Sequence, residues 1–465
     1  MNQAAQWINN HEYDAPEARR SGRLSFLKFL LRYPIFLLAF GPPIFRAPIV
    51  GTDTSQAHFD MWNILQVGWI SLVALRAILR LTAAERILIP KQVRSVLTYA
   101  MLLGLLFLIS VTYSPGRVIS TEYSILYLLT LICMIEFIVD VHRAPPNWVQ
   151  FLFHLRLIGL LLIVLALLTL SFAPSLVVSV VPGAGIRLGG GVVAPLPLIF
   201  PIVAIISAYS FLYSLEPRVR STSFFLLGLI GTAIAQTRGA EIALFLTLAI
   251  LGIGWVKYSS KRSAYLFISG FMATTLLAGV VVGAIGGESI WRTFNRGQDI
   301  GDIASASGRT EMWKFAIQYC LTHPQGMGYI AGFRALFTTS FSLNLGANVA
   351  KLGTTHNAFI DILADAGWLA LAVYLIMLFK VLALGWRSAK KRTSVTLGSD
   401  DASRHAIRCF LLLFCYCMME GMENSVFCIP LQGPFYYQNL IIAIILGASA
   451  TMVASSRSQH APFVR

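Results

Sequence analysis

Residues 157–172 read LIGLLLIVLALLTLSF and contain no charged side chain. An apolar helix of about 20 residues crosses the ~30 Å hydrocarbon core of a bilayer. Similar runs recur along the 465-residue chain, which is 56% hydrophobic and only 12% charged, with a mean hydropathy of +0.70. Soluble globular proteins carry about 25% charged residues. Because no soluble core could bury so many long apolar runs, the sequence predicts an all-α polytopic integral membrane protein.

The apolar runs and the polar breaks between them predict about twelve transmembrane segments. Their approximate bounds are 25–43, 59–78, 96–113, 122–141, 155–177, 195–214, 221–236, 240–256, 264–284, 356–380, 407–427 and 436–454. The predicted organisation is a cytoplasmic tail at 1–24, transmembrane helices 1–9 at 25–284, an outer loop at 285–355, transmembrane helices 10–12 at 356–454 and a second cytoplasmic tail at 455–465. The polar N-terminal stretch lacks signal-peptide architecture, so the first segment is expected to remain as an anchor.

Membrane topology explains the formal net charge of +15 better than nucleic acid does. Cytoplasmic loops of membrane proteins are enriched in Lys and Arg. With a cytoplasmic N-terminus, the loops on that side hold most of the basic residues, among them Arg80, Arg86, Lys91, Arg94, Arg143, Arg156, Arg218, Arg220, Lys257, Lys261, Arg262, Arg387, Lys390, Lys391 and Arg392. Nucleic acid is therefore not expected as a partner. The six cysteines form no metal-ligand pattern, so neither a metal site nor a disulfide framework is predicted.

The outer loop is the exception to this charge distribution. It is the only predicted extramembrane region long enough to fold. Outer loops normally avoid Lys and Arg, yet this one contains Arg292, Arg296, Arg309, Lys314, Arg334 and Lys351. An anionic ligand would account for basic residues on this side.

The stretch Thr237-Arg238-Gly239 separates two apolar runs. A single helix over 221–256 would be about 54 Å long at 1.5 Å per residue, well beyond the bilayer. We therefore expect a hairpin that turns here, where glycine permits a tight turn. Arg238 then lies at the outer boundary, where it either snorkels beside Glu241 or faces a lipid diphosphate, whose oxygens fit the planar guanidinium.

A helix is also predicted behind Ser307-Gly308-Arg309 in the outer loop, because Met312, Phe315, Ala316 and Tyr319 follow at helical spacing. His323-Pro324 ends it. Arg309 falls in the first turn, where the helix dipole disfavours a cation and favours an anion. The residue is thus either part of a surface salt bridge, with Glu311 or Asp302 for example, or it contacts an anion bound between its guanidinium and the helix N-terminus.

A histidine opens the tenth segment in the stretch Thr354-Thr355-His356-Asn357. With Thr355 as the expected N-cap, His356 would lie in the first turn at the membrane surface, on the same side as Arg238 and Arg309. A lone histidine is usually structural. The convergence of three unusual residues on one face favours proton transfer instead, for which histidine is well suited near neutral pH.

Several acids lie in or near membrane segments, where they are costly and are functional candidates by default. Asp361 and Asp365 share one helix face, and Glu420 and Glu423 lie near the outer end of the eleventh segment. Pairing with nearby arginines or between helices is an equally good interpretation of all four. Glu136 and Asp140 are expected to be structural, and Gly326 and Gly328 most simply provide turns.

The order of these motifs resembles the O-antigen ligase and polymerase superfamily over about residues 220–385. The residues that carry the resemblance are Thr237-Arg238-Gly239-Ala240, Ser307-Gly308-Arg309 with Trp313, His323-Pro324, Gly326-x-Gly328, and His356-Asn357 with Gly367. The resemblance implies a metal-independent, inverting glycosyltransferase of the GT-C type in the bacterial inner membrane, without a cofactor. Its donor would be a glycan on undecaprenyl diphosphate, used at the periplasmic face.

By the same resemblance, Arg238 and Arg309 bind the diphosphate and His356 activates or orients the acceptor hydroxyl. Arg292, Arg334, Asp361 and Glu423 complete the candidate substrate-binding set. The acceptor is either a second lipid-linked glycan, as in a polymerase, or lipid A core, as in a ligase. We favour polymerisation of a surface or secreted polysaccharide, in which a chain-length regulator protein is a candidate partner. A flippase for the same lipid-linked glycan is the second alternative, although it would be expected to have a midplane charged path and an inverted repeat.

Overall fold

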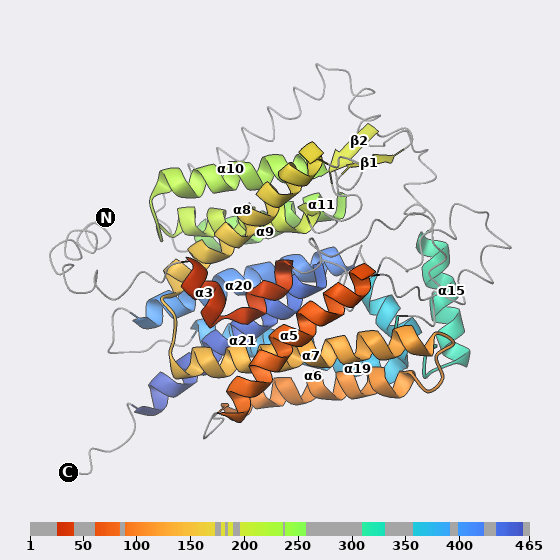
Figure 1. Cartoon of the computed structure of the whole chain (residues 1–465). Coiled ribbons are helices and arrows are strands. Elements are labelled where there is room, and N and C mark those ends of the chain that lie inside the picture. The colour runs from red at the N-terminus through yellow and green to blue at the C-terminus, as the bar shows by residue number, and fades with distance from the viewer. Residues whose placement is uncertain are drawn as a thin grey trace, which may run out of the picture.

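The computed structural model describes eleven stretches of the chain: 26–40, 61–83, 89–172, 178–181, 185–188, 196–235, 238–256, 309–330, 357–390, 399–422 and 434–458. The helices form an elongated bundle, with α15 at one end (Figure 1). The first half contains α3 (Phe26–Arg32), the 3-10 helix η1 (Pro34–Phe40), α5 (Met61–Thr82), α6 (Lys91–Ser110), α7 (Arg117–Arg143) and α8 (Trp148–Phe172). The second half contains α9 (Leu196–Leu212), α10 (Arg218–Ala235), α11 (Arg238–Val256), α15 (Arg309–Thr322), α19 (Ala358–Lys390), α20 (Ser399–Gly421) and α21 (Pro434–Ser458).

Six helices in the described stretches are long and apolar enough to cross a membrane: Lys91–Ser110, Ser120–Arg143, Trp148–Phe172, Gly239–Val256, Ala358–Lys390 and Ala402–Gly421. Shorter apolar helices cover Ile199–Leu212 and Gln438–Met452. These spans make the chain a multi-pass membrane protein. The predicted segment at 264–284 lies outside the described residues, and the described part of the chain shows six of the twelve predicted spans at full length.

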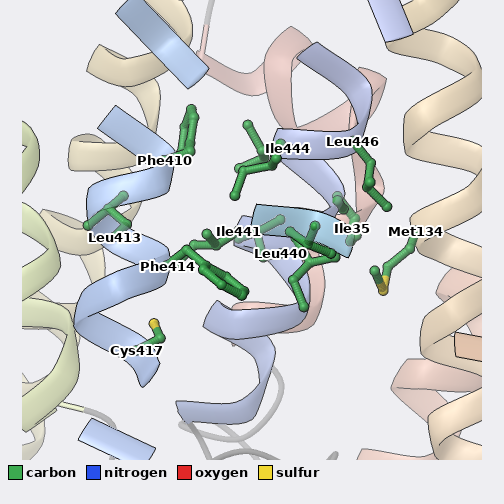
Figure 2. Packing of buried hydrophobic residues seen from close by; sticks show 14 of the residues in the cluster. Ile35, Met134, Phe410, Leu413, Phe414, Cys417, Leu440, Ile441, Ile444 and Leu446 are labelled. Carbon is green, nitrogen blue, oxygen red and sulfur yellow. The ribbon is translucent and has the colours of Figure 1, made fainter. Parts of the chain in front are cut away.

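The helix α21 is the centre of the bundle. Every side chain from 438 to 452 is buried, and the helix packs against α7, α19, α20 and η1. Figure 2 shows Phe410 and Phe414 of α20 beside Ile441 and Ile444 of α21. A helix that is apolar all round needs neighbours on every side, which explains why the last predicted segment is the most deeply packed.

Hydrogen bonds assign the helix termini to two ends of the bundle. At one end, the α6–α7 turn and the start of α19 both contact the segment that follows α15; we call this the α15 end. At the other, Lys380 of α19 bonds Ser95 of α6, and Arg408 of α20 bonds the carbonyl of Ala389. We call this second end the ion-pair end, because the ion pairs Arg80–Asp140 and Arg156–Glu216 lie there, the latter just beyond the end of α9.

Two details correct the sequence-based prediction. The first segment, predicted at 25–43, is not one helix: α3 ends at Arg32 and η1 begins at Pro34. Proline lacks an N–H group and disfavours helical geometry in the residue before it, so the chain breaks at Tyr33. In addition, a small antiparallel hairpin pairs β1 (Val178–Val181) with β2 (Gly185–Leu188) in a fold predicted to be entirely helical.

Candidate functional site

The segment Pro324–Ile330, which follows α15, lies between the start of α19 and the α6–α7 turn. On the α19 side, the Met327 N–H donates to the carbonyl of Ala364 at 2.9 Å, and the Gly328 N–H donates to the carbonyl of Asp365 at 2.7 Å. The Trp368 N–H donates in return to the carbonyl of Pro324 at 3.0 Å. These carbonyls and the amide are available because α19 is kinked, so the segment replaces helical hydrogen bonds that the kink removes.

Glycine makes this close approach feasible at three positions. Gly367, at the kink, has φ 82° and ψ −179°, and a Cβ there would lie 2.3 Å from the Pro324 carbonyl oxygen. Gly328 has φ 111°, and a Cβ there would lie 2.2 Å from the Cβ of Ser114. Both backbone conformations strongly favour glycine. Gly326 has φ 79°, and a Cβ there would lie 2.7 Å from the carbonyl carbon of Asp365, so it adds a third such position. Gly326 and Gly328 therefore do more than form a turn, because they let the segment pack against α19 and the α6–α7 turn.

The α6–α7 turn holds the other side of the segment. The Ser110 hydroxyl accepts from the Tyr329 N–H at 2.9 Å, and the Ser120 hydroxyl donates to the Tyr329 carbonyl at 2.7 Å. The Tyr113 hydroxyl donates to the carbonyl of Gln325 at 2.7 Å. The fully buried Tyr329 ring stacks on Phe107 with centroids 3.8 Å apart. This side of the segment is thus bound through its backbone and through one aromatic anchor.

Asp365 contributes a buried carboxylate to the same junction. Its Oδ2 accepts from the Ile330 N–H at 2.9 Å, and its side chain is only 7% exposed. Burial raises the pKa of Tyr113, and the nearby Asp365 carboxylate raises it further. Burial, again with a contribution from Asp365, raises the pKa of the Cys320 thiol to about 12. The Asp365 carboxylate therefore accepts a hydrogen bond from a backbone N–H, while the neighbouring Tyr113 hydroxyl and Cys320 thiol stay protonated.

The helix α15 packs on the first turns of α19 through a small apolar cluster. Its buried members are Met312, Ala316, Cys320, Leu363 and Ala364. The Trp368 indole N–H also donates to the carbonyl of Cys320 at 3.1 Å. The helix predicted behind Ser307-Gly308-Arg309 is confirmed as α15, and it ends before His323-Pro324 as expected.

Both predicted arginines begin helices: Arg238 is the first residue of α11, and Arg309 is the first residue of α15. The predicted break between the two apolar runs is confirmed, because α10 ends at Ala235 and α11 begins at Arg238, while Thr237 of the predicted turn lies outside the described residues. At the other terminus of α11, the Trp255 indole bonds the Leu212 carbonyl, which lies at the ion-pair end. The start of α11 consequently points to the end where α15 and the start of α19 lie.

The N-cap of α19 differs from the prediction. Asn357, not Thr355, caps the helix: its Oδ1 accepts from the N–H groups of Phe359 at 3.0 Å and Ile360 at 3.2 Å. Its Nδ2 donates to the carbonyl of Met422, just beyond α20, at 3.0 Å. The predicted His356 therefore immediately precedes the cap rather than lying in the first helical turn, and the chain beside it is tied to α20.

The remaining predicted site residues divide into two groups. Asp361 is half-buried in the first turn of α19, and Glu420 is buried near the end of α20. His356 itself lies outside the described residues, as do Arg292, Arg334 and Glu423. Sequence analysis missed the docking roles of Ser110, Tyr113 and Ser120, since isolated polar residues at a helix end carry no distinctive motif. Within the described ranges, no three or more His, Cys, Asp or Glu residues gather to hold a metal ion.

The fold and the α15 end thus define a multi-pass membrane protein with basic helix starts gathered at one end. Residues 223–375, about a third of the chain, match a family model described as O-antigen ligase. The match runs from α10 to the kinked part of α19 and includes α11 and α15. Members of this family are glycan-transferring enzymes that use lipid-linked glycans. A search of the curated proteins finds no match.

Proposed function

We propose that the protein transfers a glycan from undecaprenyl diphosphate to a sugar hydroxyl at the periplasmic face of the inner membrane, and that it polymerises a surface or secreted polysaccharide. The observation that carries this proposal is the family domain at 223–375, together with the position of its helix starts. Arg238, Arg309 and the Asn357 cap of α19 belong to one end of the bundle and to this one domain.

Two arginines at helix starts suit a diphosphate leaving group. The N-terminus of a helix carries exposed N–H groups and about half a positive charge from the helix dipole. A guanidinium beside it adds a planar pair of donors that matches phosphate oxygens. Charge that develops as the lipid diphosphate leaves would be stabilised by donors already in place. Arg238 and Arg309 fill this role in the proposal, without a metal ion.

His356 is the proposed general base. It would remove the proton from the acceptor hydroxyl while the oxygen attacks the anomeric carbon from the face opposite the diphosphate, which inverts the configuration. The tie between Asn357 and the end of α20 supports this role, because it fixes the chain next to His356. A base must be held within hydrogen-bond reach of the proton it removes.

Reconstitution with a purified lipid-linked repeat unit, with and without lipid A core, tests the reaction class. A ladder of products identifies a polymerase, whereas a single transfer to core identifies a ligase, the activity in the printed description of the family. Movement of the lipid across the bilayer without formation of a glycosidic bond identifies a flippase and contradicts the proposal. A chain-length regulator added to the assay should narrow the ladder if it is a partner.

The periplasmic orientation has its own test. In a background without native cysteines, single cysteines replace Ser340 in the outer loop and Ser394 between α19 and α20. An impermeant thiol reagent should label the first position and not the second in intact spheroplasts. The reverse pattern would invert the topology and remove the site from the periplasm.

A further inference from the structure

Asp365 joins two elements that both belong to the candidate site. Its carboxylate accepts from the Ile330 N–H at 2.9 Å, and its carbonyl accepts from the Gly328 N–H at 2.7 Å. Asp365 of α19 therefore bonds both Gly328 and Ile330 in the segment that follows α15. Because the side chain is 7% exposed and Ile330 is 2% exposed, water cannot easily replace the carboxylate.

The backbone held by Asp365 is strained. Ile330 has φ 64°, in the left-handed region that β-branched residues rarely occupy. Such a conformation persists only where its surroundings enforce it, and strain of this kind gathers at functional sites. The Asp365 carboxylate supplies the enforcing contact on one side, and the Ser110 and Ser120 hydroxyls bond the preceding Tyr329 on the other.

Among the described residues, α15 packs on α19 through a buried apolar cluster of five residues. Two hydrogen bonds accompany it, from the Trp368 indole N–H to the Cys320 carbonyl and from the Cys320 thiol to the Leu363 carbonyl. The segment clamped by Asp365 leaves α15 directly, since the helix ends at Thr322. A loose segment would therefore let α15, with Arg309 at its far terminus, move relative to the start of α19.

From this geometry we propose that Asp365 is a positioning residue: by clamping residues 324–330 it fixes α15, and so the helix start at Arg309, relative to the first turns of α19. The inference rests on the proposed function of Arg309 and His356. In this proposal Asp365 does not itself contact the substrate. A neutral acceptor oxygen at this position keeps the hydrogen bond from the uncharged Ile330 N–H.

Two variants separate positioning from proton transfer. In Asp365→Asn the amide oxygen can still accept from Ile330, and kcat should stay within about threefold of wild type. In Asp365→Ala the acceptor is lost, and kcat should fall by about 10–100-fold, because a misplacement of ~1 Å can cost about 100-fold in rate. The KM for the lipid-linked donor should change by less than about threefold. Thr130→Val, which removes a buried hydroxyl that bonds only within α7, serves as the matched control.

A distance measurement tests the clamp independently of catalysis. Spin labels at Gln318 of α15 and Arg117 at the start of α7, both exposed, report the position of α15 in the otherwise cysteine-free full-length protein. We expect one narrow distance distribution in wild type, in Thr130→Val and in Asp365→Asn, and a broader or longer one in Asp365→Ala. An unchanged distribution in Asp365→Ala overturns the proposal, as does an Asp365→Asn variant as slow as Asp365→Ala. If wild type shows no glycosyl transfer at all, the proposed function fails, while the distances still decide whether Asp365 fixes α15.

Discussion

The two ends of the helix bundle are held together by different chemistry. The four ion pairs among the described residues all lie at the ion-pair end: Arg32–Asp140, Arg80–Asp140, Arg80–Glu136 and Arg156–Glu216. At the α15 end, the contacts described above are backbone hydrogen bonds, serine and tyrosine hydroxyls, an asparagine cap and one carboxylate that accepts from an N–H. Within the described part of the chain, none of these contacts at the α15 end involves an arginine side chain.

Because of this difference, we expect one end to determine the stability of the fold and the other to determine catalysis, and the two can be measured separately. Arginines at the ion-pair end neutralise acids of the fold, so their loss should lower stability. Arginines at the start of α11 and α15 should matter for a bound anion instead. Substitutions at the two ends should consequently affect different observables, and each prediction below tests that separation.

The largest expected effect is at His356. His356→Ala and His356→Gln should each lower kcat by about 10²–10⁴-fold, the usual range for loss of a general base, because neither side chain can take the proton. Both variants should still bind the lipid-linked donor. A general base must be neutral to accept a proton, so the wild-type rate should fall as the pH is lowered into the range where histidine side chains become protonated. A His356→Gln variant that keeps most of its activity would contradict proton abstraction by this residue.

The next effect concerns Arg238 and Arg309. Each changed to Ala should lower kcat by about 10²–10³-fold, comparable to the loss of one donor to a developing anion. Lys should restore only part of the rate, since a point charge lacks the two-pronged fit to phosphate. Membrane insertion and thermal stability should stay at wild-type levels, measured by fractionation and by unfolding in detergent. If the Ala variants lose stability but keep the wild-type rate per folded molecule, Arg238 and Arg309 stabilise the fold and do not bind the diphosphate.

Local signals in the sequence were sufficient for most helices and for the turns between them. Length and hydropathy identified α6, α7 and α8, while Thr237-Arg238-Gly239 marked the separation of α10 from α11 and Pro324 marked the end of α15. Asn and Thr are both good N-caps, so the local sequence could not distinguish Asn357 from Thr355. That choice depends on the contact of Asn357 with Met422, 65 residues away in sequence.

The docking of Pro324–Ile330 could not be predicted for a related reason. Its partners are distant in sequence, 35 residues for Ile330 with Asp365 and 212 for Tyr113 with Gln325. Glycines in a short polar stretch predict a turn equally well whether or not the turn packs against a helix. The sequence identified Asp365 as a costly acid in a membrane helix, but only the fold shows that it accepts from a backbone N–H.

The third prediction tests the α15 end through glycine. Gly367→Ala places a Cβ 2.3 Å from the Pro324 oxygen at a φ of 82°, in a conformation that only glycine adopts readily. The strain should cost about 1–3 kcal/mol, loosen the segment and reduce kcat by about tenfold. Gly68→Ala is the control, because nothing lies within 4 Å of its new methyl group. The control should be neutral or slightly stabilising, as Ala is favoured over Gly in helices by about 1 kcal/mol. Equal effects of the two substitutions on thermal unfolding and rate would show that the contacts at Gly367 are unimportant.

The smallest effect on catalysis is expected at the ion-pair end. Asp140 accepts from Arg32 at 3.2 Å and from Arg80 at 2.9 Å, while Glu136 pairs with the other nitrogen of Arg80. Two positive and two negative groups thus balance, and Asp140→Asn leaves one positive charge uncompensated while it preserves shape. Removing one partner of a fully buried pair costs about 3–5 kcal/mol. Because the arginine side chains are 29% and 38% exposed, solvent screening should reduce this loss to roughly 1 kcal/mol.

Thermal unfolding of Asp140→Asn should therefore shift to lower temperature, with kcat and KM within about twofold of wild type at a temperature where the variant is folded. The two ends differ in this respect because Asp140 stabilises the packing of α3, α5 and α7, none of which contributes a proposed catalytic residue. A tenfold loss of kcat in folded Asp140→Asn would show that the ion-pair end controls the α15 end. The two ends would then not act independently, and α7, which runs from one end to the other, would transmit changes at Asp140 to the α15 end.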